Sequence, residues 1–253
     1  MTTIANANFT GMVMFERSHR ENDLLVKFLT REYGKRMFFI KNAKRADFKL
    51  RSAVLPFSYG KYTGLIRSSG LSYVNAAIDV RQFENIFQEI ELNAYATFII
   101  NLIDAAFEDN LKIESWYDRI ERALILIDTG NDAEIVSDLI QIQLLNSFGI
   151  SITWDRCVVC GRNDLPLDYS ESFGGMLCRN HWEKDSHRWN LSSKSSRIIR
   201  MLSMISIFKL GQISVSDTTK AEIWRLMDSI YKDQVGINLK SRSFIDQMNN
   251  WKA

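Results

Sequence analysis

The 253-residue chain contains only three cysteines and two prolines, and these low counts reduce the number of protein classes to which it can belong. Three cysteines cannot pair evenly, which argues against a disulfide framework. The two prolines and twelve glycines form no linker, repeat or low-complexity tract. No apolar run approaches the ~18 residues that a membrane span needs. The first residues carry no basic group ahead of their apolar stretch, unlike an export signal. We therefore expect a reducing cytoplasm as the compartment, where disulfides are rare.

Motifs for catalysis are also missing. "FGGMLC" lacks the Lys-Ser/Thr that follows a phosphate-binding loop, and no Gly-x-Ser-x-Gly elbow occurs. His19 and His187 have no evident nucleophile as partner. We therefore expect a binding protein and not an enzyme.

Charge is unevenly distributed along a chain whose net charge is only +2. Residues 1–80 carry 13 Lys/Arg against 6 Asp/Glu, whereas residues 81–156 carry 5 against 14. A basic head beside an acidic middle favours a polyanionic ligand for the head. The alternative is a solvated basic face without a partner. The overall composition, 46% hydrophobic and 25% charged, is that of an ordinary globular protein.

The first 80 residues predict a small barrel. Short runs rich in Val, Phe, Ile and Tyr alternate with turn residues, which is typical of strands. Gly34 suits a hairpin turn that needs a positive φ, and Pro56 is expected at an edge or bulge. About five strands so close together favour an oligonucleotide-binding (OB) barrel over residues 1–80. The expected strands cover residues 10–16, 23–32, 35–43, 49–60 and 62–78.

After residue 80 the hydrophobic period becomes helical, so the expected fold class is α+β, with an all-α domain over residues 81–253. In residues 132–149, Asp132 suits the helix start and Gly149 the helix end. Further helices are expected within residues 81–109, 193–211, 217–232 and 243–252. A cysteine-containing segment, residues 154–190, is expected as an insertion in this domain.

All three cysteines lie in one short segment, as the pairs Cys157-x-x-Cys160 and Cys178-x-x-His181 with 17 residues between the pairs. Zn²⁺ takes four tetrahedral sulfur or nitrogen ligands, and a two-residue gap directs both side chains of a pair at one point. Four protein ligands close the site, so we expect structural zinc. One alternative is three buried cysteines that pack as small hydrophobes. Another is a zinc hydrolase or deaminase, because "HWE" imitates a deaminase element, but its order relative to the Cys-x-x-Cys pair is reversed.

Three stretches resemble the RecO family of DNA repair and recombination mediators. "GMVMFERSHRENDLLVKFLTREYGKRMFFIKNAKR" is similar to its opening strands, "CVVCG" with "FGGMLCRNH" to its zinc segment, and "QVGINLKSRSFIDQM" to its Lys-Ser-Arg stretch. Two positions depart from the family pattern. Asn42 stands where glycine is frequent, and Asn tolerates a left-handed φ. His181 stands where a fourth cysteine is frequent.

The resemblance implies an OB barrel, a helical domain and a zinc segment attached to it. It also implies binding of single- and double-stranded DNA, annealing of complementary strands coated with single-stranded DNA-binding protein, and help with RecA loading together with RecR. The expected partners are DNA, RecR and the C-terminal tail of the single-stranded DNA-binding protein, with RecA and RecF indirectly. A nucleoid-associated location follows from these partners.

Basic residues of the head suit this role, because Lys and Arg meet phosphates and release counterions. Arg17, Arg20 and Lys27 extend the main cluster. Phe38 and Phe39 point to opposite faces, so one is expected in the core and the other is a candidate stacking platform. The alternative is that both serve only barrel packing. Tyr59 and Tyr62 are weaker candidates. The expected DNA-binding residues are Lys35, Arg36, Lys41, Lys44, Arg45, Lys49 and Arg51.

A second basic surface is expected near the C-terminus, from Arg197, Arg200, Lys240 and Arg242. It suits either DNA or the acidic tail of the single-stranded DNA-binding protein. A rival from another class also remains: a zinc-containing RNA-binding or ribosome-associated OB protein shares the barrel and the basic head.

Overall fold

The computed structural model describes residues 4–252. The chain divides into two compact units, Met1–Thr129 and Gly130–Ala253. Over the described residues, no helix combines the length and the apolar character needed to cross a lipid bilayer.

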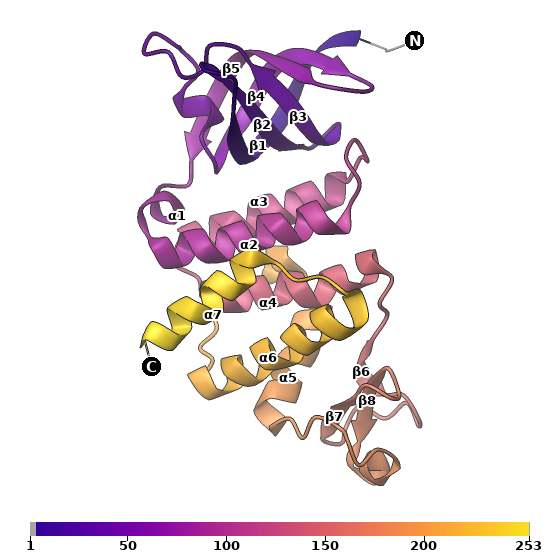
Figure 1. Ribbon diagram of the computed structural model, residues 1–253. Coiled ribbons are helices and arrows are strands. Elements are labelled where there is room, and N and C mark those ends of the chain that lie inside the picture. The colour runs from indigo at the N-terminus through magenta and orange to yellow at the C-terminus, as the bar shows by residue number, and fades with distance from the viewer. Residues whose placement is uncertain (1–3, 253) are drawn as a thin grey trace. The chain divides into compact units, whose positions relative to one another are not determined.

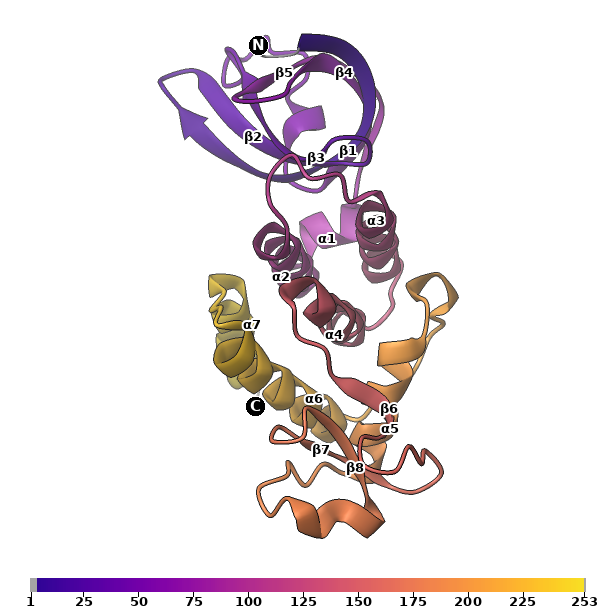
Figure 2. The same cartoon turned by 90° about the vertical axis from the view of Figure 1, so that its right-hand side faces the viewer.

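The first unit begins with five strands that close into a barrel in the order β1-β2-β3-β5-β4. β4 pairs back onto β1, and only the β3–β5 pair is parallel. Figure 2 looks nearly along the barrel, whose strands form a ring. The expected five-stranded OB-like barrel is thereby confirmed. The strands are β1 (Ile4–His19), β2 (Asp23–Thr30), β3 (Gly34–Ile40), β4 (Ser58–Arg67) and β5 (Ser72–Gln82).

Aromatic rings fill the barrel. Phe38 packs against Phe9 and Phe28 with ring centroids 5.2 and 4.9 Å apart, and Tyr62 lies 5.0 Å from Phe28. The buried Tyr62 hydroxyl donates to the Ala53 carbonyl at 2.7 Å, so its polar group stays satisfied. Each buried ring contributes about 2–3 kcal/mol through apolar area removed from water. Phe38 and Tyr62 are therefore core residues.

The fourth and fifth strands differ from the sequence expectation. Residues 49–57 form turns and the short 3-10 helix η1 (Ser52–Val54), and β4 begins only at Ser58. Pro56 lies in the turn before β4, where its missing N–H costs no ladder hydrogen bond. The run expected as one strand over 62–78 is broken at Gly70, whose φ is +79°. It therefore contributes to both β4 and β5.

Three helices complete the first unit, and Figure 1 shows α2 and α3 side by side. They are α1 (Glu84–Gln88), α2 (Ile90–Ala106) and α3 (Glu114–Asp128). The sequence reading did not include α3. Its buried stripe contains Tyr117, Ile120, Leu124 and Ile127, which has the helical spacing.

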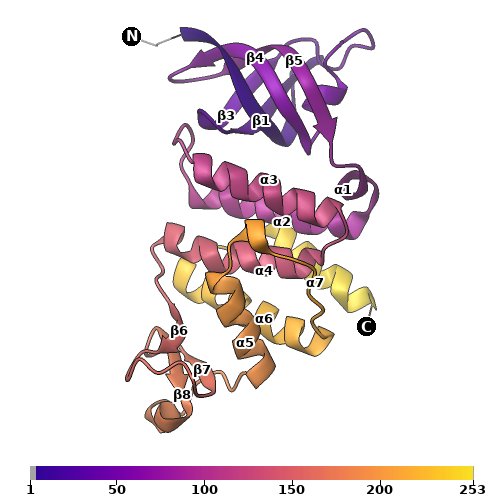
Figure 3. The same ribbon diagram turned by 180° about the vertical axis from the view of Figure 1, so that it is seen from behind.

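The second unit contains four longer helices, and the packed group α4, α5 and α6 is visible in Figure 3. Asp132 begins α4 as predicted, because its side chain accepts from the N–H groups of Glu134 and Ile135. Gly149 follows with a φ of +80° and ends the turn after α4, also as predicted. The helices are α4 (Ala133–Leu144), α5 (Ser193–Met204), α6 (Asp217–Ser229) and α7 (Lys240–Lys252).

A small sheet lies between α4 and α5 in the sequence and contacts α5. Its strands run in the order β6-β8-β7, and the 3-10 helix η3 follows β8. Gly175 opens β8 where a Cβ would meet Val158 and the Thr153 carbonyl closer than 3.0 Å. The elements are β6 (Thr153–Cys157), β7 (Leu167–Ser170), β8 (Gly175–Cys178) and η3 (Arg179–Lys184).

Candidate metal centre and nucleic-acid interface

The predicted ligands Cys157, Cys160, Cys178 and His181 come together at one end of the small sheet. Their ligand atoms all lie within 4.8 Å of one another. Cys160 Sγ is 3.7 Å from Cys178 Sγ, and His181 Nδ1 is 3.3 Å from Cys178 Sγ and 3.6 Å from Cys157 Sγ. Zn–S bonds of ~2.3 Å and Zn–N bonds of ~2.0 Å give tetrahedron edges of about 3.5–3.8 Å. The donor set and its spacing therefore fit a tetrahedral metal.

Two tight turns create this arrangement. Cys157 ends β6, and the turn to Cys160 closes with a 2.8 Å hydrogen bond from the Gly161 N–H to the Cys157 carbonyl. Gly161 has a φ of +72°, which a glycine adopts without strain. Cys178 ends β8, and His181 follows one turn later in η3. Burial alone would raise the pKa of the Cys157 thiol, but backbone N–H groups and His181 lower it to about 6, which favours the thiolate that metals bind.

Polar contacts hold the rest of the segment in place. Asp168 accepts from the backbone N–H groups of Asn190 and Leu191 at 3.0 and 2.9 Å and pairs with Arg188 at 3.0 Å. Asp185 is bonded by the Ser170 hydroxyl and by the His187 N–H. These bonds join β7 to the end of the segment without using the four clustered residues. The four residues Cys157, Cys160, Cys178 and His181 could therefore hold one metal ion as a closed set of ligands.

Five of the seven predicted DNA-binding residues project from the connection between β3 and β4. Glu16 lies near Arg51 and Lys44: burial raises the pKa of its carboxyl, and the two cations oppose that rise. Within the described residues, the only ion pair formed by the five joins Arg45 to Asp47 at 3.6 Å. These exposed residues, here called the basic loop, are Lys41, Lys44, Arg45, Lys49 and Arg51.

Backbone bonds and apolar anchors fix the basic loop on the barrel. The Asn42 N–H donates to the Asp23 carboxylate at 2.8 Å, and the Lys44 N–H donates to the Asn22 carbonyl at 3.1 Å. Ala43 is buried in the barrel core, and Phe48 packs against it. Asn42 has a φ of +57°, as expected for a residue in place of glycine. The charged side chains of the basic loop are therefore exposed to solvent, whereas its backbone is fixed to the barrel.

Lys35 does not belong to this surface. It is only 2% exposed, and its ammonium donates to the Asp104 carbonyl at 2.6 Å and to the Asp104 carboxylate at 2.9 Å. Lys27 joins the same group, 2.5 Å from Asp104 and 2.9 Å from Asp109. These four residues, here called the ionic joint, link β2 and β3 to α2 and the loop after it. The expectation that Lys35 contacts DNA phosphates does not fit this burial.

The pKa values in the ionic joint agree with its charges. Burial would raise the pKa of Asp104, but hydrogen bonds from Lys27 and Lys35 outweigh it and hold the pKa below its usual 3.8. Burial would lower the pKa of Lys27, but Asp104 and Asp109 raise it above 10.5. Asp104 and Lys27 are therefore both charged at neutral pH.

Arg36 is also withdrawn from solvent. It is 9% exposed, and its guanidinium donates to the carbonyls of Tyr33 and Arg67 at 3.0 and 2.5 Å. Burial lowers its pKa. Because these bonds tie β3 to the turn before it and to the end of β4, the guanidinium is engaged within the fold and does not suit phosphate binding.

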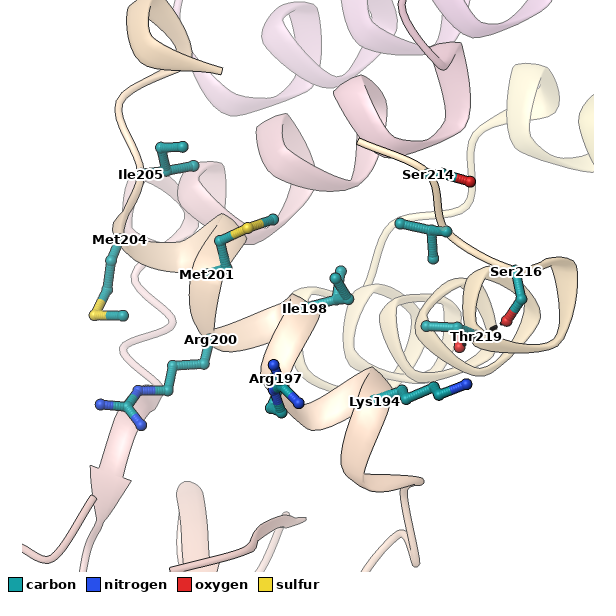
Figure 4. Close-up of a pocket in the computed structure, with 11 residues that line it drawn as sticks. Lys194, Arg197, Ile198, Arg200, Met201, Met204, Ile205, Ser214, Ser216 and Thr219 are labelled. Carbon is teal, nitrogen blue, oxygen red and sulfur yellow. Dashed lines mark hydrogen bonds between the residues drawn. The ribbon is translucent and has the colours of Figure 1, made fainter. Parts of the chain in front are cut away.

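The predicted second basic surface also contains both buried and exposed cations. Arg242 is 5% exposed, donates to Gln141 Oε1 at 2.9 Å and lies over the Trp224 ring at 3.9 Å, so it fastens α7 to the helical core. Lys240 is exposed. Arg197 and Arg200 line a pocket of about 900 Å³ on α5 together with Lys194 (Figure 4). Sequence reasoning did not foresee a pocket here.

The pocket combines an apolar lining with basic residues. Lys194 and Arg200 extend in opposite directions from α5 in Figure 4, and Arg200 donates to the Asn163 carbonyl at 2.8 Å. Thr219 and Ser216 border the pocket from the start of α6. An anionic ligand with apolar groups fits this lining. Its apolar residues are Ile198, Met201, Met204, Ile205 and Val215.

Comparisons with known proteins cover almost the whole chain. The family model described as "Recombination protein O N terminal" matches residues 1–83, and "Recombination protein O C terminal" matches residues 88–243. Proteins named "DNA repair protein RecO" are among the similar relatives. The one from Pediococcus pentosaceus is 77% identical over 252 residues, 100% of both chains. The one from Lactiplantibacillus plantarum is 48% identical over 244 residues, 96% of this chain and 95% of the relative.

Proposed function

Because the chain belongs to the RecO family of DNA repair proteins, we propose that it binds single- and double-stranded DNA through the basic loop. From there it anneals complementary strands coated with single-stranded DNA-binding protein and, with RecR, helps to load RecA. The role is that of a mediator without a catalytic step of its own. The observation that carries the proposal is the basic loop itself, whose five cations are exposed while hydrogen bonds hold its backbone to the barrel. Among the described residues, the ion pair that these cations form is between Arg45 and Asp47.

Charge screening is the physical reason why exposed cations support both DNA binding and annealing. Each neutralised phosphate releases counterions, so five cations on one connection give strongly salt-dependent binding without sequence preference. Annealing needs two polyanions to approach each other while their base edges stay free. Contacts to the backbone alone satisfy both needs, because base edges are not used in such contacts.

Annealing of two complementary strands, each precoated with its cognate single-stranded DNA-binding protein, tests this function. The protein should accelerate duplex formation, and the effect should fall as salt rises. Unchanged annealing, together with no salt-dependent DNA binding, would contradict the proposal. A competition between single-stranded DNA and RNA of equal length separates it from the RNA-binding alternative, which predicts preference for RNA.

The pocket on α5 is proposed as the site for the acidic C-terminal tail of the single-stranded DNA-binding protein. Charge complementarity with Lys194, Arg197 and Arg200 supports this choice. Arg197→Glu should weaken binding of the isolated tail peptide, whereas Lys240→Glu, an exposed cation outside the pocket lining, should not. Equal loss in both variants would show only a general charge effect.

The metal is proposed to be one structural Zn²⁺ held by the Cys157, Cys160, Cys178 and His181 side chains. Support comes from the ligand spacing and from the closed set of four. Metal analysis of the purified protein should find about one zinc per chain. His181→Asn should lower that content, and His187→Asn, an exposed histidine outside the cluster, should retain it. Equal zinc in both variants would contradict the assignment.

A further inference from the structure

Three aromatic side chains form a row on the outside of the barrel. The rings of His19 and Phe39 have centroids 5.8 Å apart at 88°, and those of Phe39 and Tyr73 are 5.9 Å apart at 79°. The Arg67 guanidinium continues the row 5.0 Å from the Tyr73 ring. None of these three rings belongs to the buried core, and each is half-buried.

The strand register explains why the row lies outside. Phe38 points into the core at 0% exposure, so its neighbour Phe39 points out. Phe39 pairs with Tyr73 on β5, and opposite residues share a face. His19 lies at the end of β1. The row therefore crosses from β1 to β3 and β5 and ends at Arg67 on β4.

Exposed cations flank the row. Arg17 lies across β2 from Phe39 in the register, because both pair with Leu25. Lys41 follows Phe39 by two residues, directly before the rest of the basic loop. A polymer that presents flat rings beside a phosphate backbone matches both features, since aromatic side chains stack on bases and cations meet phosphates. Single-stranded DNA is such a polymer.

We propose that His19, Phe39 and Tyr73 form a base-stacking track for unpaired DNA bases, with Arg17, Lys41 and Arg67 beside it. The inference rests on the proposed DNA binding and assigns different roles to the basic loop and the track. The basic loop grips any DNA backbone, single or double. The track recognises only unpaired bases, because bases in a duplex are already stacked on one another.

Variants that remove a ring but keep apolar volume test the track. Phe39→Leu and Tyr73→Leu should each weaken binding of oligo(dT) about tenfold and leave binding of a duplex of equal length unchanged. Tyr59→Leu is the matched control. Tyr59 is also half-buried on the barrel, but its ring stacks on Phe83 at 4.2 Å, so its loss should not affect oligo(dT) binding.

An abasic oligonucleotide provides a second measurement, which separates base stacking from binding of the DNA backbone. Without bases to stack, wild-type protein and Phe39→Leu should bind it equally. A remaining difference would overturn the track, as would equal loss of oligo(dT) and duplex binding in Phe39→Leu.

Unchanged binding in both ring variants would also overturn the track and would leave the row as a surface for a protein partner. Failure of the proposed function gives a different result, because wild-type protein would then bind neither DNA form.

Discussion

Two groups of basic residues lie within 25 residues of each other on the same barrel, and their surroundings differ. Lys27 and Lys35 are buried against Asp104 and Asp109 in the ionic joint. The five cations of the basic loop are exposed, and among the described residues the ion pair they form is the one between Arg45 and Asp47. The charge of the first group is paired with carboxylates within the fold, whereas the side chains of the second group are exposed to solvent. Net charge along a sequence therefore overstates the charge that a partner can meet.

The largest expected effect separates the two groups by stability. Lys35→Met should lower the free energy of unfolding by about 2 kcal/mol, because it removes a buried cation from carboxylates that remain partly exposed. Lys44→Met should change it by less than about 0.5 kcal/mol. Urea unfolding measures both. Equal stability of the two variants would contradict the distinction between the buried Lys35 and the exposed Lys44.

A pH titration tests the carboxylate side of the joint. Because the folded pKa of Asp104 lies below 3.8, its stabilisation is present above about pH 4 and is lost as the pH falls through that lower value. On the alkaline side, the contribution of Lys27 is present below 10.5 and is lost as the pH rises through its raised folded pKa.

Asp104→Asn should therefore weaken the acid dependence of the melting temperature below about pH 4. Asp79→Asn, an exposed aspartate for which no ion pair is found among the described residues, is the control. An unchanged acid profile in Asp104→Asn would show that the joint does not contribute as described.

The smallest expected effect concerns a third cation of the barrel. Arg31 pairs with Asp118 on α3 at 2.8 Å, but it is 44% exposed and water screens the pair. Asp118→Asn should shift the melting temperature less than Lys35→Met does. A larger shift would mean that exposure does not rank these ion pairs.

The cluster of three cysteines and one histidine could be predicted from the sequence because its residues are close together in the chain. The two x-x spacings specify both turns, Gly161 closes the first of them, and Cys157 and His181 meet as expected. The barrel was predictable for a similar reason, since alternating apolar residues such as Phe38 mark its core.

The ionic joint and the stacking row could not be read in the same way. Asp104 lies 69 residues from Lys35, and no spacing rule links them. Tyr73 meets Phe39 only through a parallel pairing of β3 with β5. Helix α3 was overlooked, although Tyr117, Ile120 and Leu124 carry the helical period that identifies it.

The most direct measurement of the central claim is the salt dependence of single-stranded DNA binding. In the double variant Lys44→Ala/Arg45→Ala, the slope of log affinity against log salt should shrink by about 1.4, as expected for two lost phosphate contacts. In folded Lys35→Met the slope should equal that of the wild type. An unchanged slope in the double variant, or a reduced slope in Lys35→Met, would contradict the account.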